Sequence, residues 1–218
     1  MKTEYRQRLP HIQPVGSAFF VTFSLFGSVP KKQVEELKER YTFKIIKAKL
    51  LKDPYLRNLE IFTIRKQYLF EYDVLLDAIN KGSDYLKDDN IRSIIKNELL
   101  KYDGHLYELI AFCIMSNHVH ILIDTSIQLS EVKDEEELEI NYVPLDKIMK
   151  KIKGPTAMYC NKFLNRSGQF WERESFDMYV RNEKMLNNVI SYILQNPVKA
   201  GIVKHWEDFN GNYLKIDS

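Results

Sequence analysis

Residues 112–123 hold the feature that most constrains this chain, two histidines spaced two apart within an apolar run. The run reads Phe-Cys-Ile-Met-Ser-Asn-His-Val-His-Ile-Leu-Ile. Side chains of a β-strand alternate between its two faces, so His118 and His120 project from one face while Val119 and Ile121 project from the other. The apolar set predicts a buried core face. The histidine set suits a divalent metal, because one rigid strand fixes both donors.

A histidine pair on a strand also occurs without a metal, either hydrogen-bonded or facing solvent. Burial of an imidazole costs free energy unless its nitrogens find partners. The pair therefore leaves both interpretations open until further residues are considered.

Composition sets the expected class. The 218 residues, 44% of them apolar, can build one large domain spanning 1–218 with a helical insertion at about 31–102. Two cysteines are too few for a disulfide framework or a cysteine metal cluster. The apolar runs are too short for a bilayer span, and the first residues lack the apolar stretch of a secretory signal. We therefore expect a cytoplasmic protein without membrane contact.

Charge is segregated along the chain although the net charge is only +2. An acidic loop is expected at about 125–146, and the chain becomes basic from Lys147 onward. Such segregation is compatible with a phosphate-facing surface and equally with two ordinary solvated faces.

The pattern of apolar residues and chain breakers predicts an alternating order of elements. Strands are expected at 17–26, 107–115 and 118–124, with a short strand-like or irregular segment at 170–180. Helices are expected at 31–52, 55–80, 89–102, 145–164 and 183–195, with a break at Gly154-Pro155 and a stop at Asn196-Pro197. This order predicts an α+β fold. We expect a ferredoxin-like antiparallel sheet with helices on one face, plus a helical insertion between the first and second strands.

The helix at 183–195 carries a second candidate group. Tyr192 and Asn196 are four residues apart and share a helical face at the margin of the apolar stripe. They can be an ordinary rim aromatic and an ordinary helix end. Alternatively, His118, His120 and the amide oxygen of Asn196 hold one divalent ion on a DNA phosphate, and Tyr192 attacks the phosphorus. A phenol with a pKa near 10 is a poor nucleophile unless its proton is removed or its anion is stabilised.

Four stretches of the chain resemble the single-tyrosine HUH transposases, specifically the branch of REP-associated tyrosine transposases and IS200-like relatives. The stretches are residues 8–11 leading into 19–23, residues 115–123, residues 153–157 with 168–171 and 176–177, and residues 191–201. Together they cover both ends of the chain and leave mainly the helical insertion and the acidic loop unmatched.

The resemblance implies a set of roles. Tyr192 is implied as the nucleophile, and His118, His120 and Asn196 as ligands of Mg²⁺ or Mn²⁺. The implied activity is cleavage and rejoining of single-stranded DNA next to a folded hairpin, through a covalent 5′-phosphotyrosine. The resemblance is compatible with a monomer and with a homodimer.

Several further residues are weaker candidates. Lys153, Arg173 and Arg181 are expected to contact DNA phosphates or to be simple surface charges. Tyr179 is a possible second tyrosine, and Gln195 is a fallback ligand one residue away from the face of Tyr192.

Two other functions stay open at this point. A metallohydrolase would use the two histidines with a carboxylate such as Asp124, and would keep its activity when Tyr192 is replaced by phenylalanine. A non-catalytic nucleic-acid-binding domain derived from a transposase would not need the four site residues together, so their joint presence argues against it.

Overall fold

The structure, a computed structural model, describes residues 4–6, 10–78, 82–130 and 141–216 of the chain. It divides into two compact units. Met1–Phe26 and Asp84–Ser218 form the sheet unit, and Gly27–Ser83 form the hairpin unit. In these described parts, no helix is both long enough and apolar enough to cross a membrane.

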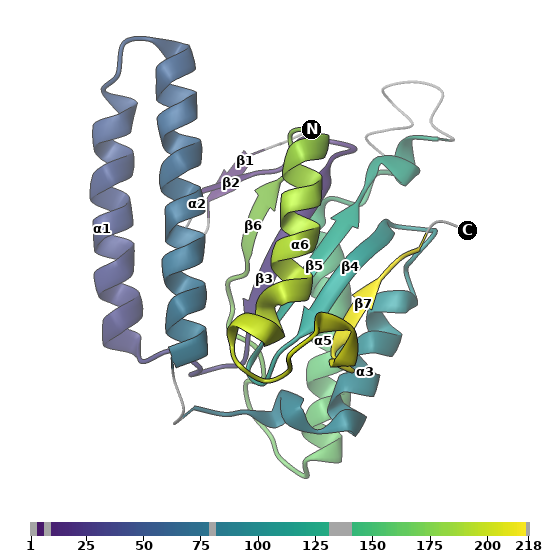
Figure 1. The fold of residues 1–218 in the computed structure, drawn as a ribbon. Helices are drawn as coiled ribbons and strands as arrows, with labels where there is room; N and C mark the ends of the chain where they lie inside the picture. The colour runs from purple at the N-terminus through teal and green to yellow at the C-terminus, as the bar shows by residue number, and fades with distance from the viewer. Residues whose placement is uncertain (1–3, 7–9, 79–81, 131–140, 217–218) are drawn as a thin grey trace. The chain divides into compact units, whose positions relative to one another are not determined.

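The sheet unit is built on five antiparallel strands (Figure 1). They are β3 (Ala18–Ser24), β4 (Glu108–Ile114), β5 (His118–Asp124), β6 (Phe176–Tyr179) and β7 (Asn212–Leu214), in the order β6-β3-β5-β4-β7. The short strands β1 (Glu4–Arg6) and β2 (Pro10–Ile12) form a separate two-stranded sheet. Helices α3 (Asp89–Leu100) and α5 (Leu145–Phe163) connect β3 to β4 and β5 to β6. This strand–helix–strand order, with β3 and β5 as neighbours between β6 and β4, confirms the predicted α+β, ferredoxin-like class.

One face of the sheet carries the main core. Val119, Ile121 and Ile123 of β5 are fully buried there with apolar residues of α3 and α5. The expected division of β5 into an apolar face and a histidine face is therefore observed, and the apolar face packs as the sequence predicted.

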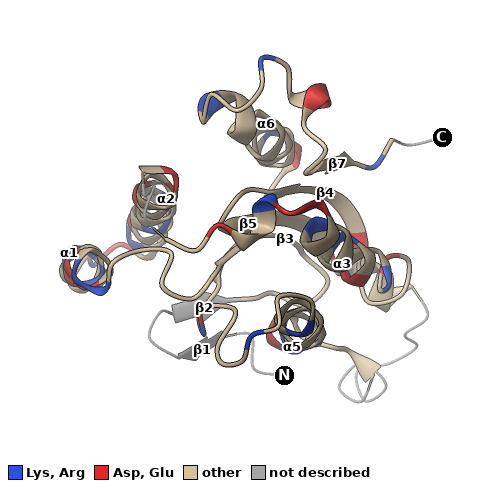
Figure 2. Ribbon diagram, turned by 90° about the horizontal axis from the view of Figure 1, so that it is seen from below, with Lys and Arg blue, Asp and Glu red and all other residues tan. Residues whose placement is uncertain are grey.

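Helix α6 (Glu183–Lys199) covers the opposite face. Figure 2 shows α6 on one side of the sheet and α3 and α5 on the other. We expected helices on one face, which describes α3 and α5. The second face is also apolar, because Phe20 and Leu122 flank the histidines there. The buried residues Val189, Ile193 and Leu194 of α6 cover that face, so burial accounts for the additional layer.

Two predicted helix interruptions are wrong. Helix α5 continues through Pro155, and α6 continues through Pro197 to Lys199. Proline lacks the N–H that bonds to the carbonyl four residues earlier, which favours a break. Here each helix buries an apolar stripe on the sheet, and that burial outweighs one missing hydrogen bond. Asn196 consequently lies inside α6 and not at its end.

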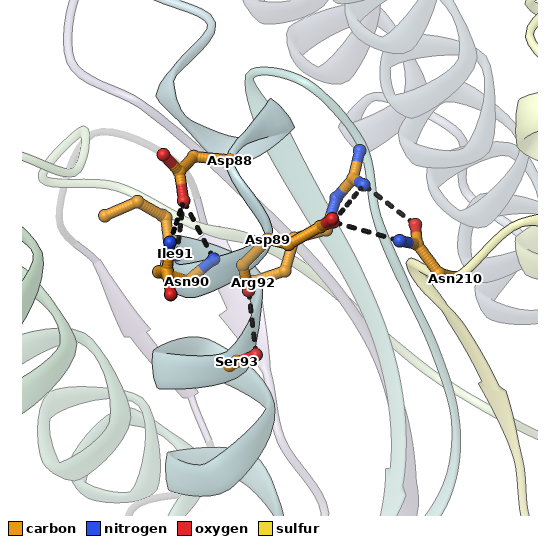
Figure 3. A network of polar contacts seen from close by, with 7 residues as sticks. All are labelled: Asp88, Asp89, Asn90, Ile91, Arg92, Ser93 and Asn210. Carbon is orange, nitrogen blue, oxygen red and sulfur yellow. Dashed lines mark hydrogen bonds and ion pairs between the residues drawn. The ribbon is translucent and has the colours of Figure 1, made fainter.

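Helix α3 begins at a well-satisfied cap (Figure 3). The Asp88 carboxylate accepts hydrogen bonds from the backbone N–H groups of Asn90 and Ile91, at 2.8 and 3.4 Å. Asp89 and Arg92 both bond to the side chain of Asn210, which lies just before β7. These contacts stabilise the N-terminus of the helix and join it to the edge of the sheet.

The hairpin unit consists of two helices, α1 (Lys31–Lys49) and α2 (Pro54–Ala78). Tyr41 and Tyr68 pack at its centre with ring centroids 4.8 Å apart, and Arg40 pairs with Glu71 at 2.9 Å. Its two ends meet, because the backbone of Gly82 lies against Ser28. Along the chain, the hairpin unit is thus inserted between β3 and β4, as the sequence predicted.

The structure changes the boundaries expected for the helical insertion and for the acidic loop. Helix α3 belongs to the stretch 31–102 expected as an insertion, but it packs in the core of the sheet unit. Of the expected acidic loop at about 125–146, residues 126–129 form a short 3₁₀ helix. The acidic centre of that loop, residues 131–140, lies outside the described residues.

Candidate active site

The two histidines of β5 face each other inside the sheet unit. His118 and His120 are 1% and 0% exposed, and their Nε2 atoms lie 3.1 Å apart. Their rings are nearly perpendicular, with centroids 4.7 Å apart. The strand alternation predicted from the sequence therefore brings both Nε2 atoms to one point.

The second nitrogen of each ring, Nδ1, contacts a neighbouring side chain. The Asn117 amide oxygen lies 2.7 Å from His118 Nδ1, and Thr22 Oγ1 lies 2.8 Å from His120 Nδ1. An amide oxygen only accepts, so His118 Nδ1 carries the proton and its Nε2 presents a lone pair. Such partners orient metal-binding histidines in many proteins.

These two partners were not identified from the sequence. Asn117 could have been found, because it directly precedes His118. Thr22 is 98 residues away from His120 in sequence, and only the strand register places them opposite each other.

Asn196 completes the cluster from α6. Its Nδ2 lies 3.1 Å from His120 Nε2, and its Oδ1 is buried without a hydrogen-bond partner. These contacts cannot all be satisfied, since His120 Nε2 would have to donate to His118 and accept from Asn196 at once. Rotating the amide by half a turn would direct the orphan oxygen at the histidines. Three lone pairs would then converge, so the residues present fit a divalent cation.

Burial keeps both histidines neutral at pH 7. Desolvation lowers the pKa of His118 to about 3. Desolvation also lowers the pKa of His120 well below its ordinary value, with smaller contributions from His118 and Lys199. Neutral imidazole is the form that binds metals, so the environment favours ligation.

Tyr192 lies beside this cluster on α6, one helical turn before Asn196. Its ring is 5.7 Å from the ring of His120 and packs edge-on against Phe20 at 5.8 Å, measured between centroids. The structure therefore brings together the four residues that the sequence selected, from a strand and a helix far apart in the chain.

The alternative tyrosine lies elsewhere. Tyr179 of β6 is paired with Phe19 and packs against the main core, on the face of the sheet away from the histidines. Arg181 stacks over its ring at 5.1 Å. The amide that contacts His120 belongs to Asn196 and not to the fallback ligand Gln195.

The carboxylate suggested for a metallohydrolase is engaged with the backbone that follows β5. Asp124 ends β5, and its side chain accepts a hydrogen bond from the backbone of Ser126. Among the residues that the structure describes, no three His, Cys, Asp or Glu side chains are grouped as a metal site. A centre of two histidines and an asparagine amide has only two residues of those four types, so it is not a group of this kind.

The three candidate DNA contacts differ in their surroundings. The Lys153 amine donates to the Glu172 carbonyl at 2.7 Å and to Ser175 Oγ at 3.0 Å. Burial lowers its pKa to about 8, against the opposing charges of nearby glutamates. A phosphate would have to displace these bonds, whereas Arg173 and Arg181 are exposed. All three roles stay predictions.

The chain is similar to a curated protein and to a solved structure. No protein-family model matches the chain. A Haemophilus influenzae protein, named as a REP-associated tyrosine transposase, is 29% identical over 143 residues, covering 63% of this chain and 76% of that protein. A solved structure titled "Structure of the REP associates tyrosine transposase bound to a REP hairpin" aligns with 97% of this chain and 82% of that one, at 16% identity and a TM-score of 0.48. The Haemophilus influenzae protein confirms the predicted resemblance to the REP-associated tyrosine transposases.

Proposed function

We propose that this relative of the REP-associated tyrosine transposases is itself a DNA strand-transfer enzyme. It would cleave and rejoin single-stranded DNA next to hairpins through a covalent bond to Tyr192. One observation carries the proposal. Tyr192, Asn196, His118 and His120 converge at one place in the sheet unit, although they come from a strand and a helix about 70 residues apart.

The proposed reaction is an in-line displacement at phosphorus. Tyr192 Oη attacks the scissile phosphate and releases its proton to water, while the bond from phosphorus to the 3′-oxygen breaks. The 3′-oxygen takes up a proton and leaves as a 3′-hydroxyl, and the 5′-phosphate stays bound to Tyr192. Rejoining reverses these steps with a new 3′-hydroxyl, so the bond energy is conserved and no ATP is needed.

Each side chain of the site has its own role in the proposed reaction. Tyr192 supplies the nucleophile, and its contacts with Phe20 and His120 hold the ring at a fixed orientation. His118, His120 and Asn196 would hold Mg²⁺ or Mn²⁺. Such an ion, when bound, supplies Lewis-acid neutralisation of the non-bridging phosphate oxygens. Thr22 and Asn117 keep the imidazoles in place.

The proposal is tested with a labelled DNA hairpin carrying single-stranded flanks, incubated with the protein and Mn²⁺. The wild type is expected to give a protein–DNA species that survives denaturation. Tyr192→Phe should give none, because the attacking oxygen is gone. Tyr179→Phe is the matched control and should keep the adduct, since that ring lies on the other face of the sheet.

Two outcomes would contradict the proposal. DNA cleavage that persists in Tyr192→Phe would indicate hydrolysis by water, as a metallohydrolase performs it. Hairpin binding without any adduct, in the wild type and with every divalent ion tried, would indicate a binding domain that has no strand-transfer activity.

A further inference from the structure

Lys199 lies close to the proposed nucleophile in the last turn of α6. It follows Asn196 by three residues and Tyr192 by seven, so all three share one helical face. Its Nζ is 4.6 Å from the centroid of the Tyr192 ring. The positive charge of this exposed lysine is therefore held above the ring that carries the attacking oxygen.

The charge of Lys199 is available for a ligand. In the described ranges, no Asp or Glu oxygen lies within ion-pair distance of its amine, which lies over the Tyr192 ring. The Tyr192 ring in turn lies 5.7 Å from the ring of His120, measured between centroids. The ammonium thus lies against the ring of the residue that packs beside His120.

The charges of the neighbouring side chains in the site are compatible with a bound anion. None of the three proposed ligands, His118, His120 and Asn196, is a carboxylate that would repel a phosphate. A phosphodiester attacked by Tyr192 gains negative charge on its non-bridging oxygens as the new bond forms. An ammonium next to the attacking phenol is well positioned to stabilise that charge.

We propose that Lys199 is a further catalytic residue, whose ammonium binds a non-bridging oxygen of the scissile phosphate beside Tyr192. This inference rests on the strand-transfer function proposed above. The alternative is a purely structural lysine, which would stabilise the C-terminal end of α6 and the Tyr192 ring without contacting DNA.

The test compares Lys199→Gln, Lys199→Arg and a control, Lys184→Gln, which removes an exposed lysine near the other end of α6. Each protein receives two hairpin substrates. One has a normal scissile phosphodiester, and the other has a methylphosphonate there, which carries no negative charge. The rate of Tyr192 adduct formation is measured for both, together with melting temperature and Mn²⁺ affinity.

On the phosphodiester, Lys199→Gln should slow adduct formation by roughly 10- to 100-fold, Lys199→Arg should keep most of the rate, and Lys184→Gln should be unchanged. On the methylphosphonate, the loss caused by Lys199→Gln should shrink to less than about threefold, since the charge it stabilises is absent. Melting temperature and Mn²⁺ affinity should stay at wild-type values.

The inference is overturned if Lys199→Gln reacts as fast as the wild type, or if its loss is equal on the two substrates. An equal loss would indicate a structural role, because packing does not depend on the substrate's charge. Failure of the strand-transfer function itself is a separate result, in which the wild-type protein forms no adduct with either substrate.

Discussion

The Nε2 atoms of His118 and His120 lie 3.1 Å apart, and both rings are held through Nδ1 by side chains outside the pair. Neither ring can turn away without breaking a buried hydrogen bond. The protein therefore holds both Nε2 atoms at one point, beside the Asn196 oxygen that lacks a hydrogen-bond partner, and a buried unsatisfied polar group is typical of sites organised for a ligand.

Asn196 should contribute to metal binding and slightly oppose stability. Its buried Oδ1 has no partner, so Asn196→Leu should leave the free energy of unfolding of the metal-free protein unchanged or raise it by about 1 kcal/mol. The same change should weaken Mn²⁺ binding, because one ligand is removed. Urea unfolding and titration calorimetry check the two effects. His105→Ala, at an exposed histidine, is the control for both.

A result in the opposite direction would be informative. If Asn196→Leu destabilises the metal-free protein and keeps full Mn²⁺ affinity, the amide is a structural partner of His120 and not a ligand.

The two residues that contact Nδ1 of the histidines should affect metal affinity more than folding. Asn117→Ala and Thr22→Val each remove the group that orients one imidazole, and each should weaken Mn²⁺ binding or activity by about 10- to 100-fold. Thr22→Val keeps a β-branched side chain in the strand, so β3 should remain intact. Ser116→Ala, next to Asn117, should have little effect. Equal affinities in all four proteins would contradict the orienting role.

The local parts of the site were predictable from the sequence because they follow simple periodicities. The period of two placed His118 and His120 on one face of β5, and the spacing of four placed Tyr192 with Asn196 on α6. The apolar face of β5 followed from the same alternation.

The parts that the sequence did not predict depend on tertiary context. The continuation of α6 through Pro197 depends on the burial of its apolar stripe on the sheet, which local proline rules do not include. Thr22 is identified as a partner of His120 only through the register between β3 and β5. Lys199 becomes a candidate only because α6 continues far enough to place its amine over Tyr192.

Mild acid should destabilise the metal-free protein through the buried histidines. Burial lowers the pKa of His118 from its ordinary 6.5 to about 3, so the unfolded chain binds a proton more readily than the folded one between these values. The stabilising effect of the neutral ring is complete above pH 6.5 and is lost as the pH falls toward 3. The expected loss is roughly 1.4 kcal/mol per pH unit for this residue within that window.

Urea unfolding in the presence of a chelator, at pH 7.5, 6.5 and 5.5, measures this dependence. His105→Gln should keep the slope of the wild type, since it changes an exposed histidine. His118→Gln should flatten the slope. A free energy of unfolding that does not change between pH 7.5 and 5.5 would show that the histidines are protonated in the folded state without cost.

Trp171 is expected to act in the core and not as a platform for an unpaired base. It is 4% exposed, its Nε1 donates to Thr156 Oγ1 at 3.0 Å, and its ring packs edge-on against Phe23 with centroids 4.8 Å apart. Trp171→Phe removes that hydrogen bond and leaves a small cavity. The free energy of unfolding should fall by about 1–3 kcal/mol.

Adduct formation measured well below the melting temperature separates packing from stacking. A core role predicts that Trp171→Phe keeps the wild-type rate and DNA affinity despite its lower stability. Trp206→Phe, at a half-buried tryptophan, should lose less stability and also keep activity. If Trp171→Phe instead weakens hairpin binding while its stability is unchanged, the indole contacts DNA. The buried hydrogen bond to Thr156 would then have to break when DNA binds.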